Sequence, residues 1–304
     1  MQYALLDSLQ PDAPWHGPGS SARRTLPAPF KMQLLKWIGN KQRFAHEIAA
    51  SFPERFGTYL EPFLGSAAVL GTLMPARALG SDVFSPLVGI WRTLKDDSEL
   101  LVSWYAERIA RRHQLGKERA YEEILASYNA RPNPADFLYL TRACYGGVVR
   151  FRKDGYMSTP CGVHEPVPVE SFAERAAVWQ RRVSGASFEH LDYREAMDRA
   201  RPGDVVYCDP PYADTQAILY GAQAFRFGDL LKAIAACKER GVFVALSHDG
   251  TKKSGAVMCG MPIPDGLFAR EVAVNVGRSM LRRFQREGDT LEDEVVHDRL
   301  LLTV

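Results

Sequence analysis

The tetrapeptide Asp209-Pro210-Pro211-Tyr212 is the part of the chain whose residue types could most directly do chemistry. It follows the apolar stretch 205–208, which predicts a strand, and open parallel sheets bind ligands beyond the carboxyl ends of their strands. The Asp209 carboxylate and the Pro210 carbonyl can accept the two hydrogens of a nucleobase amino group, which would make that nitrogen more nucleophilic. Two consecutive prolines fix the backbone, and the Tyr212 ring can stack on an extruded base. The alternative is a simple turn, since Asp-Pro after a strand is common turn chemistry.

Two weaker features precede this tetrapeptide and gain meaning from their order. The segment 61–67, read Glu-Pro-Phe-Leu-Gly-Ser-Ala, lies at a predicted strand-to-helix turn, where Gly65 would let the backbone approach a ligand closely. Asp82 ends the next predicted strand, and an acid there can accept hydrogen bonds from ribose hydroxyls. Each feature alone is more often only a turn. A glycine turn, an acid after the next strand and an acid–aromatic tetrapeptide together predict a nucleoside pocket with a catalytic edge.

The hydrophobic pattern predicts an α/β fold with a helical insertion. Strand, glycine turn, helix and strand alternate in the outer parts of the chain, as in a doubly wound sheet. The middle has helical periodicity and few strand signals. Strands are expected at 58–63, 78–82, 187–190, 204–208, 242–246, 270–276 and 299–304, and helices at 41–52, 66–73, 87–93, 100–112, 117–128, 134–145 and 227–239.

This pattern divides the chain into a core, an insertion and an arm. Residues 1–29 are rich in Pro, Gly and Ser and are expected to form a flexible arm. Segments 30–85 and 186–304 are expected to form the catalytic core, and 86–185 a mostly helical recognition domain. Asp154-Gly155 is a hairpin turn signal, which places a hairpin near 148–162.

Composition limits the classes of protein to which the chain can belong. Its 304 residues are 46% hydrophobic and 24% charged, with a net charge of +2, which is ordinary for a soluble globular protein. No apolar run is long enough to cross a membrane. The five cysteines form no C-x-x-C pair, and the seven histidines have no metal-ligand spacing, so no metal site is expected. An odd cysteine count without disulfide-type spacing favours reduced thiols in the cytoplasm.

The motifs together resemble the Dam-type, alpha-group DNA adenine methyltransferases of bacteria and phages, from about Phe30 to Val304. The segments 35–41 and 61–67 resemble the family's L-K-W-x-G-G-K and E-P-F-x-G-x-G motifs, and 204–213 resembles its catalytic segment. Ser247-His248-Asp249 resembles its S-N-H-D-like stretch, and 188–193 resembles the segment before the catalytic strand. The resemblance implies a Rossmann-like S-adenosylmethionine-dependent methyltransferase core that methylates the exocyclic N6 of a flipped adenine.

The resemblance also assigns residues to roles. Catalysis is expected at Asp209, Pro210, Pro211 and Tyr212. The segment 137–147 resembles a target-recognition helix and 150–162 a DNA-contacting hairpin. DNA contacts are expected from Arg142, Tyr145, Arg150, Arg152 and Lys153. S-adenosylmethionine is expected to lie against Lys36, Trp37, Gly39, Lys41, Glu61, Pro62, Phe63, Gly65, Ser66, Asp82, Asp192, Tyr193 and Asp209.

The sequence departs from the family at several points and leaves alternatives open. Asn40 and Ala67 replace motif glycines, Phe84-Ser85 replaces an asparagine after the ribose-binding acid, and the late stretch lacks an asparagine. The alternatives are cytosine-N4 methylation, although Asp209 favours adenine over cytosine, and an impaired DNA-binding protein on the same scaffold. The expected partners are double-stranded DNA and, in a restriction–modification role, a cognate restriction endonuclease. A bacterial or phage-encoded cytoplasmic protein, monomeric or weakly dimeric, is expected.

Overall fold

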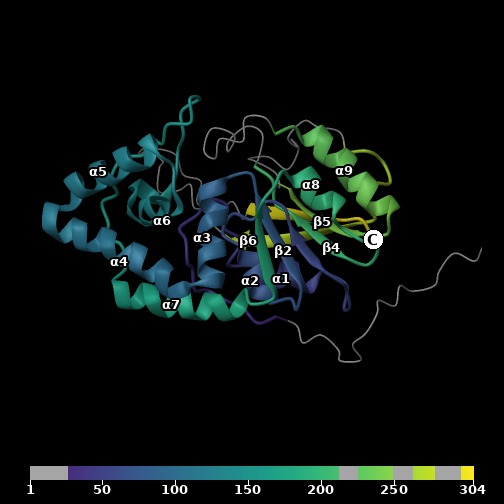
Figure 1. Cartoon of the computed structure of the whole chain (residues 1–304). Coiled ribbons are helices and arrows are strands. Elements are labelled where there is room, and N and C mark those ends of the chain that lie inside the picture. Colours follow the sequence, from purple (N-terminus) through teal and green to yellow (C-terminus); the bar gives the residue numbers. More distant parts are fainter. Residues whose placement is uncertain (1–26, 212–224, 249–262, 278–295) are drawn as a thin grey trace, which may run out of the picture.

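A computed structural model of the chain describes residues 27–211, 225–248, 263–277 and 296–304. Within these ranges seven strands form one sheet in the order β3-β2-β1-β4-β5-β7-β6 (Figure 1). Strands β3, β2, β1, β4 and β5 are parallel neighbours, and β7 runs antiparallel to both β5 and β6. The strands are β1 (Tyr59–Glu61), β2 (Ala78–Asp82), β3 (Ala186–His190), β4 (Val205–Cys208), β5 (Phe243–His248), β6 (Arg270–Gly277) and β7 (Val296–Leu302).

The two faces of the sheet are covered by different helices because side chains alternate along each strand. Tyr59 of β1 and Tyr207 of β4 face the cluster that includes α1 (Ala45–Ala50) and α2 (Ala68–Leu73). Their neighbours Leu60 and Val206 face a second cluster with α8 (Tyr193–Asp198) and α9 (Phe227–Glu239). Figure 1 shows α8 and α9 on one side of the sheet and α1 and α2 on the other. The predicted Rossmann-like α/β architecture is therefore confirmed.

The helices of the middle segment form a lobe beside the sheet (Figure 1). Within this lobe, the Arg108 guanidinium donates a 2.8 Å hydrogen bond to the Asp136 carboxylate. The Asn133 side chain caps the helix that begins at Pro134, because its oxygen accepts from the Asp136 amide. The lobe contains α4 (Ser98–Leu115), α5 (Lys117–Ala130), α6 (Pro134–Ala143) and the short 3-10 turn η1 (Tyr145–Gly147), and α3 (Ser85–Asp96) and α7 (Val169–Arg182) join it to the sheet. The sequence missed α7 and α8. No helix in the described ranges is long and apolar enough to cross a membrane.

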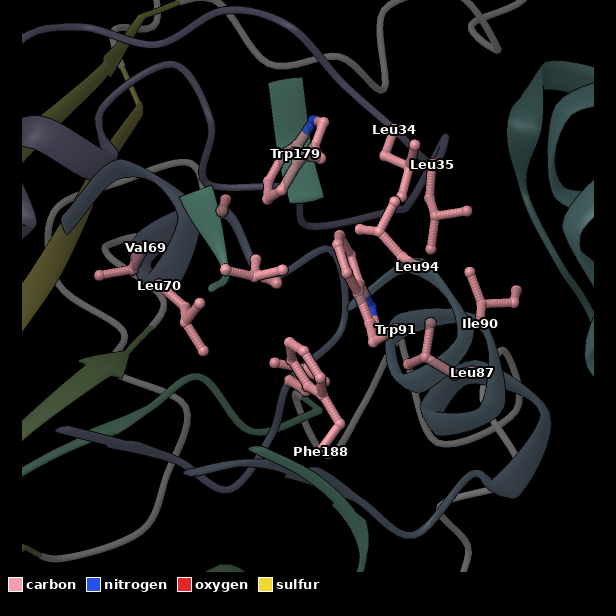
Figure 2. Close-up of a cluster of buried hydrophobic side chains, with 14 of the residues drawn as sticks. Leu34, Leu35, Val69, Leu70, Leu87, Ile90, Trp91, Leu94, Trp179 and Phe188 are labelled. Carbon is pink, nitrogen blue, oxygen red and sulfur yellow. The ribbon is translucent and has the colours of Figure 1, made fainter. Parts of the chain in front are cut away.

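Two tryptophans hold the lobe and the sheet in one hydrophobic core. Trp91 of α3 and Trp179 of α7 are fully buried, with ring centroids 5.1 Å apart, and Figure 2 shows them among leucines of the 34–35 segment, α2 and α3. Trp91 also stacks on Phe188 of β3, at 6.0 Å. The insertion and the core are thus continuous in packing, so the domain boundaries at 85 and 186 remain a prediction about sequence organisation. Residues 1–26 of the predicted arm lie outside the described residues.

The close approach of α2 to Trp179 predicts an unusual response to a glycine substitution. A Cβ at Gly71 would lie 2.2 Å from Cζ3 of Trp179. Gly71→Ala should therefore destabilise the protein by about 1–3 kcal/mol through overpacking, although alanine is normally favoured over glycine in helices.

Gly228 provides the matched control because it is an exposed helical glycine with nothing within 4 Å of its Cβ position. Gly228→Ala should leave stability unchanged or raise it by up to about 1 kcal/mol. Urea unfolding followed by circular dichroism measures both variants. An unchanged or higher urea midpoint for Gly71→Ala would contradict the packing described for Trp179.

Candidate active site

A cavity of about 350 Å³ lies where the carboxyl ends of the parallel strands meet. Glu61 ends β1, Asp82 ends β2, and Asp209 follows β4. Because β2, β1 and β4 are adjacent and parallel, their terminal acids must gather at one edge. The predicted residues that line this cavity are Trp37, Gly39, Lys41, Glu61, Pro62, Phe63, Gly65, Ser66, Asp82, Asp192, Tyr193, Asp209 and Pro211.

The turn after β1 brings backbone close to a tryptophan. Gly65 has a left-handed backbone with φ +44°, and a Cβ there would lie 2.9 Å from Nε1 of Trp37. Its carbonyl accepts a 3.0 Å hydrogen bond from the Trp91 indole. Ala67 is also left-handed, with φ 51°, and is fully buried. Alanine in this conformation costs about 1–2 kcal/mol, so the loop adopts a glycine-type conformation without the glycine.

Asp82 is tied to this turn and faces the cavity. Its carboxylate accepts from the amides of Gly65, at 3.3 Å, and Phe84, at 3.0 Å. Burial raises the pKa of Asp82 to about 6, and the two amide hydrogen bonds oppose that rise. Asp82 is therefore an ionised acceptor above about pH 6, positioned by the turn that follows β1 and lines the cavity.

Asp209 forms an ion pair with Lys41 across the cavity. Lys41 Nζ lies 3.0 Å from Asp209 Oδ1, and the two side chains are 6% and 19% exposed. Beside them, the hydroxyl groups of Tyr207 and Ser247 are 2.8 Å apart. Lys41 thus brings a positive charge to the acid that the sequence marks as catalytic. Pro210 is buried; Tyr212 and Asp249 lie outside the described residues.

Glu61 is an acid whose surroundings favour its protonated form. It is buried, and its Oε2 accepts from the Tyr59 hydroxyl at 2.7 Å and from the Leu70 amide at 3.0 Å. Burial raises the pKa of Glu61 to about 8, the two hydrogen bonds lower it, and the charge of Asp209 raises it further. Near neutral pH Glu61 is therefore largely neutral, whereas the pKa of Asp82 leaves that carboxyl mostly ionised.

Three aromatic rings form another wall. Tyr193 stacks on Phe63 with centroids 5.2 Å apart, and Phe225 meets both rings edge-on at 5.7 and 5.8 Å. All three line the cavity. The side of this aromatic group that lines the cavity offers an apolar surface on which a planar ring can pack.

A hairpin follows the lobe and extends from the cavity wall to an exposed tip. The amide of Arg152 donates to the Tyr156 carbonyl at 2.8 Å, and the Gly155 amide donates to the Arg152 carbonyl at 3.0 Å. Gly155 has φ +83°, as a three-residue hairpin loop with a terminal glycine requires. Phe151, at the hairpin base, lines the cavity and packs against Phe84 at 5.4 Å. Arg150, Arg152 and Lys153 are exposed.

The chain is similar in sequence to known proteins. Residues 37–253 match the family model of the D12 class N6 adenine-specific DNA methyltransferases. The chain belongs to this family. A DNA adenine methylase of Vibrio cholerae serotype O1 is 30% identical over 240 residues, covering 72% of this chain and 82% of the relative. A Type II methyltransferase of Lactococcus lactis subsp. cremoris, M1.LlaDCHI, is 26% identical over 240 residues, covering 72% and 81%. The Dam-type resemblance and the adenine specificity expected from Asp209 are confirmed.

For this D12 class methyltransferase, two of the residue predictions need correction. Arg142 was expected to contact DNA, but it is buried and donates to the carbonyl of Leu34, with its guanidinium 5.8 Å from the Phe172 ring. It lies in the last turn of α6, whose residues 136–143 are all buried. Its guanidinium therefore joins the lobe to the 34–35 segment. Lys36 does not line the cavity, and its side chain lies against Gly147.

Several residues that line the cavity were not predicted from the sequence to belong to the site. Tyr207 belongs to an apolar strand, where the sequence pattern indicates only that the side chain is buried. Phe84 and Phe151 belong to none of the cofactor motifs that the sequence resembles. Phe225 directly precedes the correctly predicted helix 227–239 and carries no motif signal. Only the three-dimensional approach of these segments brings the aromatic residues to the cavity. Tyr145, by contrast, is 41% exposed and so remains available for contact.

The raised pKa of Glu61 predicts a pH-dependent stability for the ligand-free protein. The folded protein keeps the Glu61 proton up to about pH 8, whereas the unfolded chain releases it near the ordinary value of 4.5. The free energy of unfolding from this group therefore falls as pH rises through that window, by about 1 kcal/mol per pH unit. Glu61→Gln should remove this loss, so the variant gains stability relative to the native protein from about pH 5 to pH 8.

Urea midpoints of the two proteins across this pH range measure the difference. Glu174→Gln, at an exposed position of α7, is the control and should follow the native pH dependence. Parallel curves for Glu61→Gln and the native protein would show that Glu61 does not take up a proton on folding.

Proposed function

We propose that this adenine-specific DNA methyltransferase binds S-adenosylmethionine in the described cavity and presents the adenine amino group to Asp209. One observation carries the proposal: the acid of the Asp-Pro-Pro segment opens onto the same cavity as the ribose-type acid Asp82 and the aromatic wall. A methyl donor and an acceptor base must be within reach of each other. A single cavity with both sets of residues supports that arrangement.

The residues of the cavity fit a nucleoside with a charged tail. Asp82 offers carboxylate oxygens suited to ribose hydroxyls, and Phe63, Tyr193 and Phe225 offer surfaces for a purine ring. Gly65 has no space for a side chain because the Trp37 indole packs against it, and both residues line the cavity. When bound, the cofactor supplies an already activated methyl group on a sulfonium, so the protein has to provide position and electrostatics.

Asp209 is proposed to act on the nucleophile. Its Oδ1 is held by Lys41 at 3.0 Å, which fixes the orientation of the carboxylate and favours its ionised form. An ionised Asp209 accepts a hydrogen from the adenine amino group, and the carbonyl of Pro210 is proposed to accept the other. Pro210 and Pro211 restrict the backbone at that point, and Tyr212 is proposed to stack on the extruded base.

The hairpin is proposed to contact double-stranded DNA. Arg150, Arg152 and Lys153 are exposed on it, and the Arg152 guanidinium lies 4.6 Å from the centroid of the Tyr156 ring. Arginine can interact with guanine edges, and lysine more often contacts phosphate. Tyr145 is proposed to add a contact at the hairpin base. Segments 30–85 and 186–304 would then be the catalytic core and 86–185 the recognition domain.

The partner, compartment and oligomeric state of the enzyme are also proposed. A relative is named a Type II methyltransferase, which favours a cognate restriction endonuclease as a partner; a solitary role is the alternative. We infer a cytoplasmic monomer or weak dimer. An impaired scaffold is the rival hypothesis, and it rests on Ala67 and Asn40. Ala67 keeps the left-handed conformation that a motif glycine would adopt, which supports an intact cofactor loop.

Asp209→Asn tests the catalytic proposal. The amide keeps the shape of the side chain but loses the negative charge that Lys41 holds, so kcat should fall about 100- to 10,000-fold. The dissociation constant for S-adenosylmethionine should change by less than about tenfold. Transfer of labelled methyl to unmethylated genomic DNA, with mass spectrometry of the nucleosides, measures the rate and the product.

Asp198→Asn, at an exposed position of α8, is the control and should retain native activity. Near-native turnover by Asp209→Asn would overturn the role of Asp209. Methyl-cytosine as the product would overturn the adenine assignment of the acceptor. A folded native protein that binds the cofactor and DNA but transfers no methyl group would favour the impaired scaffold.

Arg152→Ala and Lys153→Ala test the hairpin contact. Each should weaken DNA binding and reduce the slope of log affinity against log salt by up to about one. Arg119→Ala is the control, because Arg119 is also exposed but lies on α5, where it pairs with Glu123; it should change neither quantity. Arg142→Met should instead lower stability by about 1–3 kcal/mol, because it leaves the Leu34 carbonyl unpaired, with no change in the salt slope.

Fluorescence anisotropy of a labelled duplex at several salt concentrations measures these effects. Native affinity and slope in both hairpin variants would exclude the hairpin from the DNA interface. A reduced slope in a fully folded Arg142→Met protein would reverse the structural assignment of Arg142.

A further inference from the structure

Two cysteines face each other at the base of the hairpin. Cys144 caps the end of α6, and Cys161 lies where the returning segment of the hairpin ends. The two residues form an isolated antiparallel β-bridge. Both are free thiols, separated along the chain by the whole segment that holds Arg150, Arg152 and Lys153.

The hydrogen bonds around this bridge define the type of pair. The Tyr145 amide donates to the Pro160 carbonyl at 2.9 Å, and the Gly162 amide donates to the Ala143 carbonyl at 2.7 Å. These bonds flank the cysteines, so Cys144 and Cys161 form a non-hydrogen-bonded pair, in which opposite Cα atoms lie about 4.5 Å apart. Disulfides require Cα separations of about 4.4–6.8 Å. The backbone therefore already holds the two residues at a distance that a disulfide spans.

The side chains share one environment and are weakly held. The Cys144 Sγ lies 3.9 Å from the Thr141 carbonyl and the Cys161 Sγ lies 3.7 Å from the Gly162 carbonyl. These are weak contacts, so little is lost when the thiols turn toward each other. Burial and, after it, the electrostatic influence of Cys144 and Cys161 raise the pKa of the Tyr121 phenol, so both thiols are within electrostatic range of one side chain.

We propose that Cys144 and Cys161 are a reversible oxidation site that forms an intramolecular disulfide across the hairpin base. The oxidant is a low-molecular-weight disulfide. The half-buried Cys161, as thiolate, attacks one sulfur of the oxidant, giving a mixed disulfide and releasing one thiol. Cys144 loses its proton to solvent and attacks the Cys161 sulfur, releasing the second thiol. The protein loses two electrons and two protons, and the oxidant is reduced to two thiols.

Burial sets the rate of this reaction. It raises the pKa of Cys144 to about 12 and raises that of Cys161, so the thiolate population near neutral pH is small. Lys36 faces Cys144 and lowers its pKa, whereas Lys117 and Arg112 lower and Glu118 raises that of Cys161. Oxidation is therefore slow at neutral pH and faster in mild alkali. A thiol-reducing environment would keep the pair open.

The disulfide closes a loop that contains the exposed hairpin tip. Closing such a loop restricts the unfolded chain and stabilises the fold. The oxidised protein should consequently have a melting midpoint several degrees above that of the reduced protein. The site does not depend on the proposed methyl transfer, because the bridge is defined by backbone pairing alone.

Peptide mapping of the full chain tests the proposal. The native protein is incubated with oxidised glutathione at pH 8.5, its remaining thiols are blocked with N-ethylmaleimide in denaturant, and it is digested with trypsin without reduction. Cleavage after Arg142, Arg150, Lys153 and Arg175 puts the two cysteines in separate peptides, 143–150 and 154–175. A disulfide-linked pair of these peptides, which separates on reduction, is the expected result.

Controls identify the partners of the bond. Cys144→Ala and Cys161→Ala should each abolish the linked pair and the redox-dependent shift in melting midpoint, whereas Cys237→Ala should retain both. Recovery of both native peptides carrying N-ethylmaleimide after prolonged oxidation of folded protein would overturn the proposal. Linkage of Cys144 or Cys161 to any other cysteine would also overturn it.

Discussion

The adjacency of β2, β1 and β4 is the constraint on which the rest of the structure depends. Three neighbouring parallel strands end in, or lead into, an acid, so Glu61, Asp82 and Asp209 are brought into one cavity. Three carboxylates in a shared low-dielectric space repel one another. The surrounding elements offset that repulsion in different ways for each acid, and these differences distinguish the roles that the acids can have.

Each acid is stabilised by a different neighbour. Asp209 has the ammonium of Lys41 at 3.0 Å, Asp82 has backbone amides from the turn that it borders, and Glu61 is favoured in its neutral form by burial. The cavity can therefore keep an ionised carboxylate at the catalytic edge without carrying three full charges.

Sequence patterns predicted the parts of the fold that depend on local rules. Strand β2 and helix α9 were placed at their observed limits, and the acids were found because they follow apolar strands. Helix α8 was missed because six residues are too few to show a helical period. Helix α7 was also missed, although its buried residues Phe172, Ala176 and Trp179 have helical spacing that the sequence does show. The burial of Arg142 and the position of Phe225 depend on which distant segments meet. Residue type alone favoured a position at the surface for Arg142, and it indicated no role in the site for Phe225.

The aromatic contacts between the hairpin and the cavity show that the helical lobe is not a separate attachment to the sheet. Phe84 follows the ribose-type acid by two residues and packs on Phe137 of the lobe, at 4.9 Å, and on Phe151 of the hairpin, at 5.4 Å. The amide of Phe84 also donates to Asp82. A displacement of the hairpin base would therefore press on the residue that holds Asp82. The cavity and the hairpin base thus share one wall, through which the proposed binding of cofactor and of DNA should be coupled in free energy.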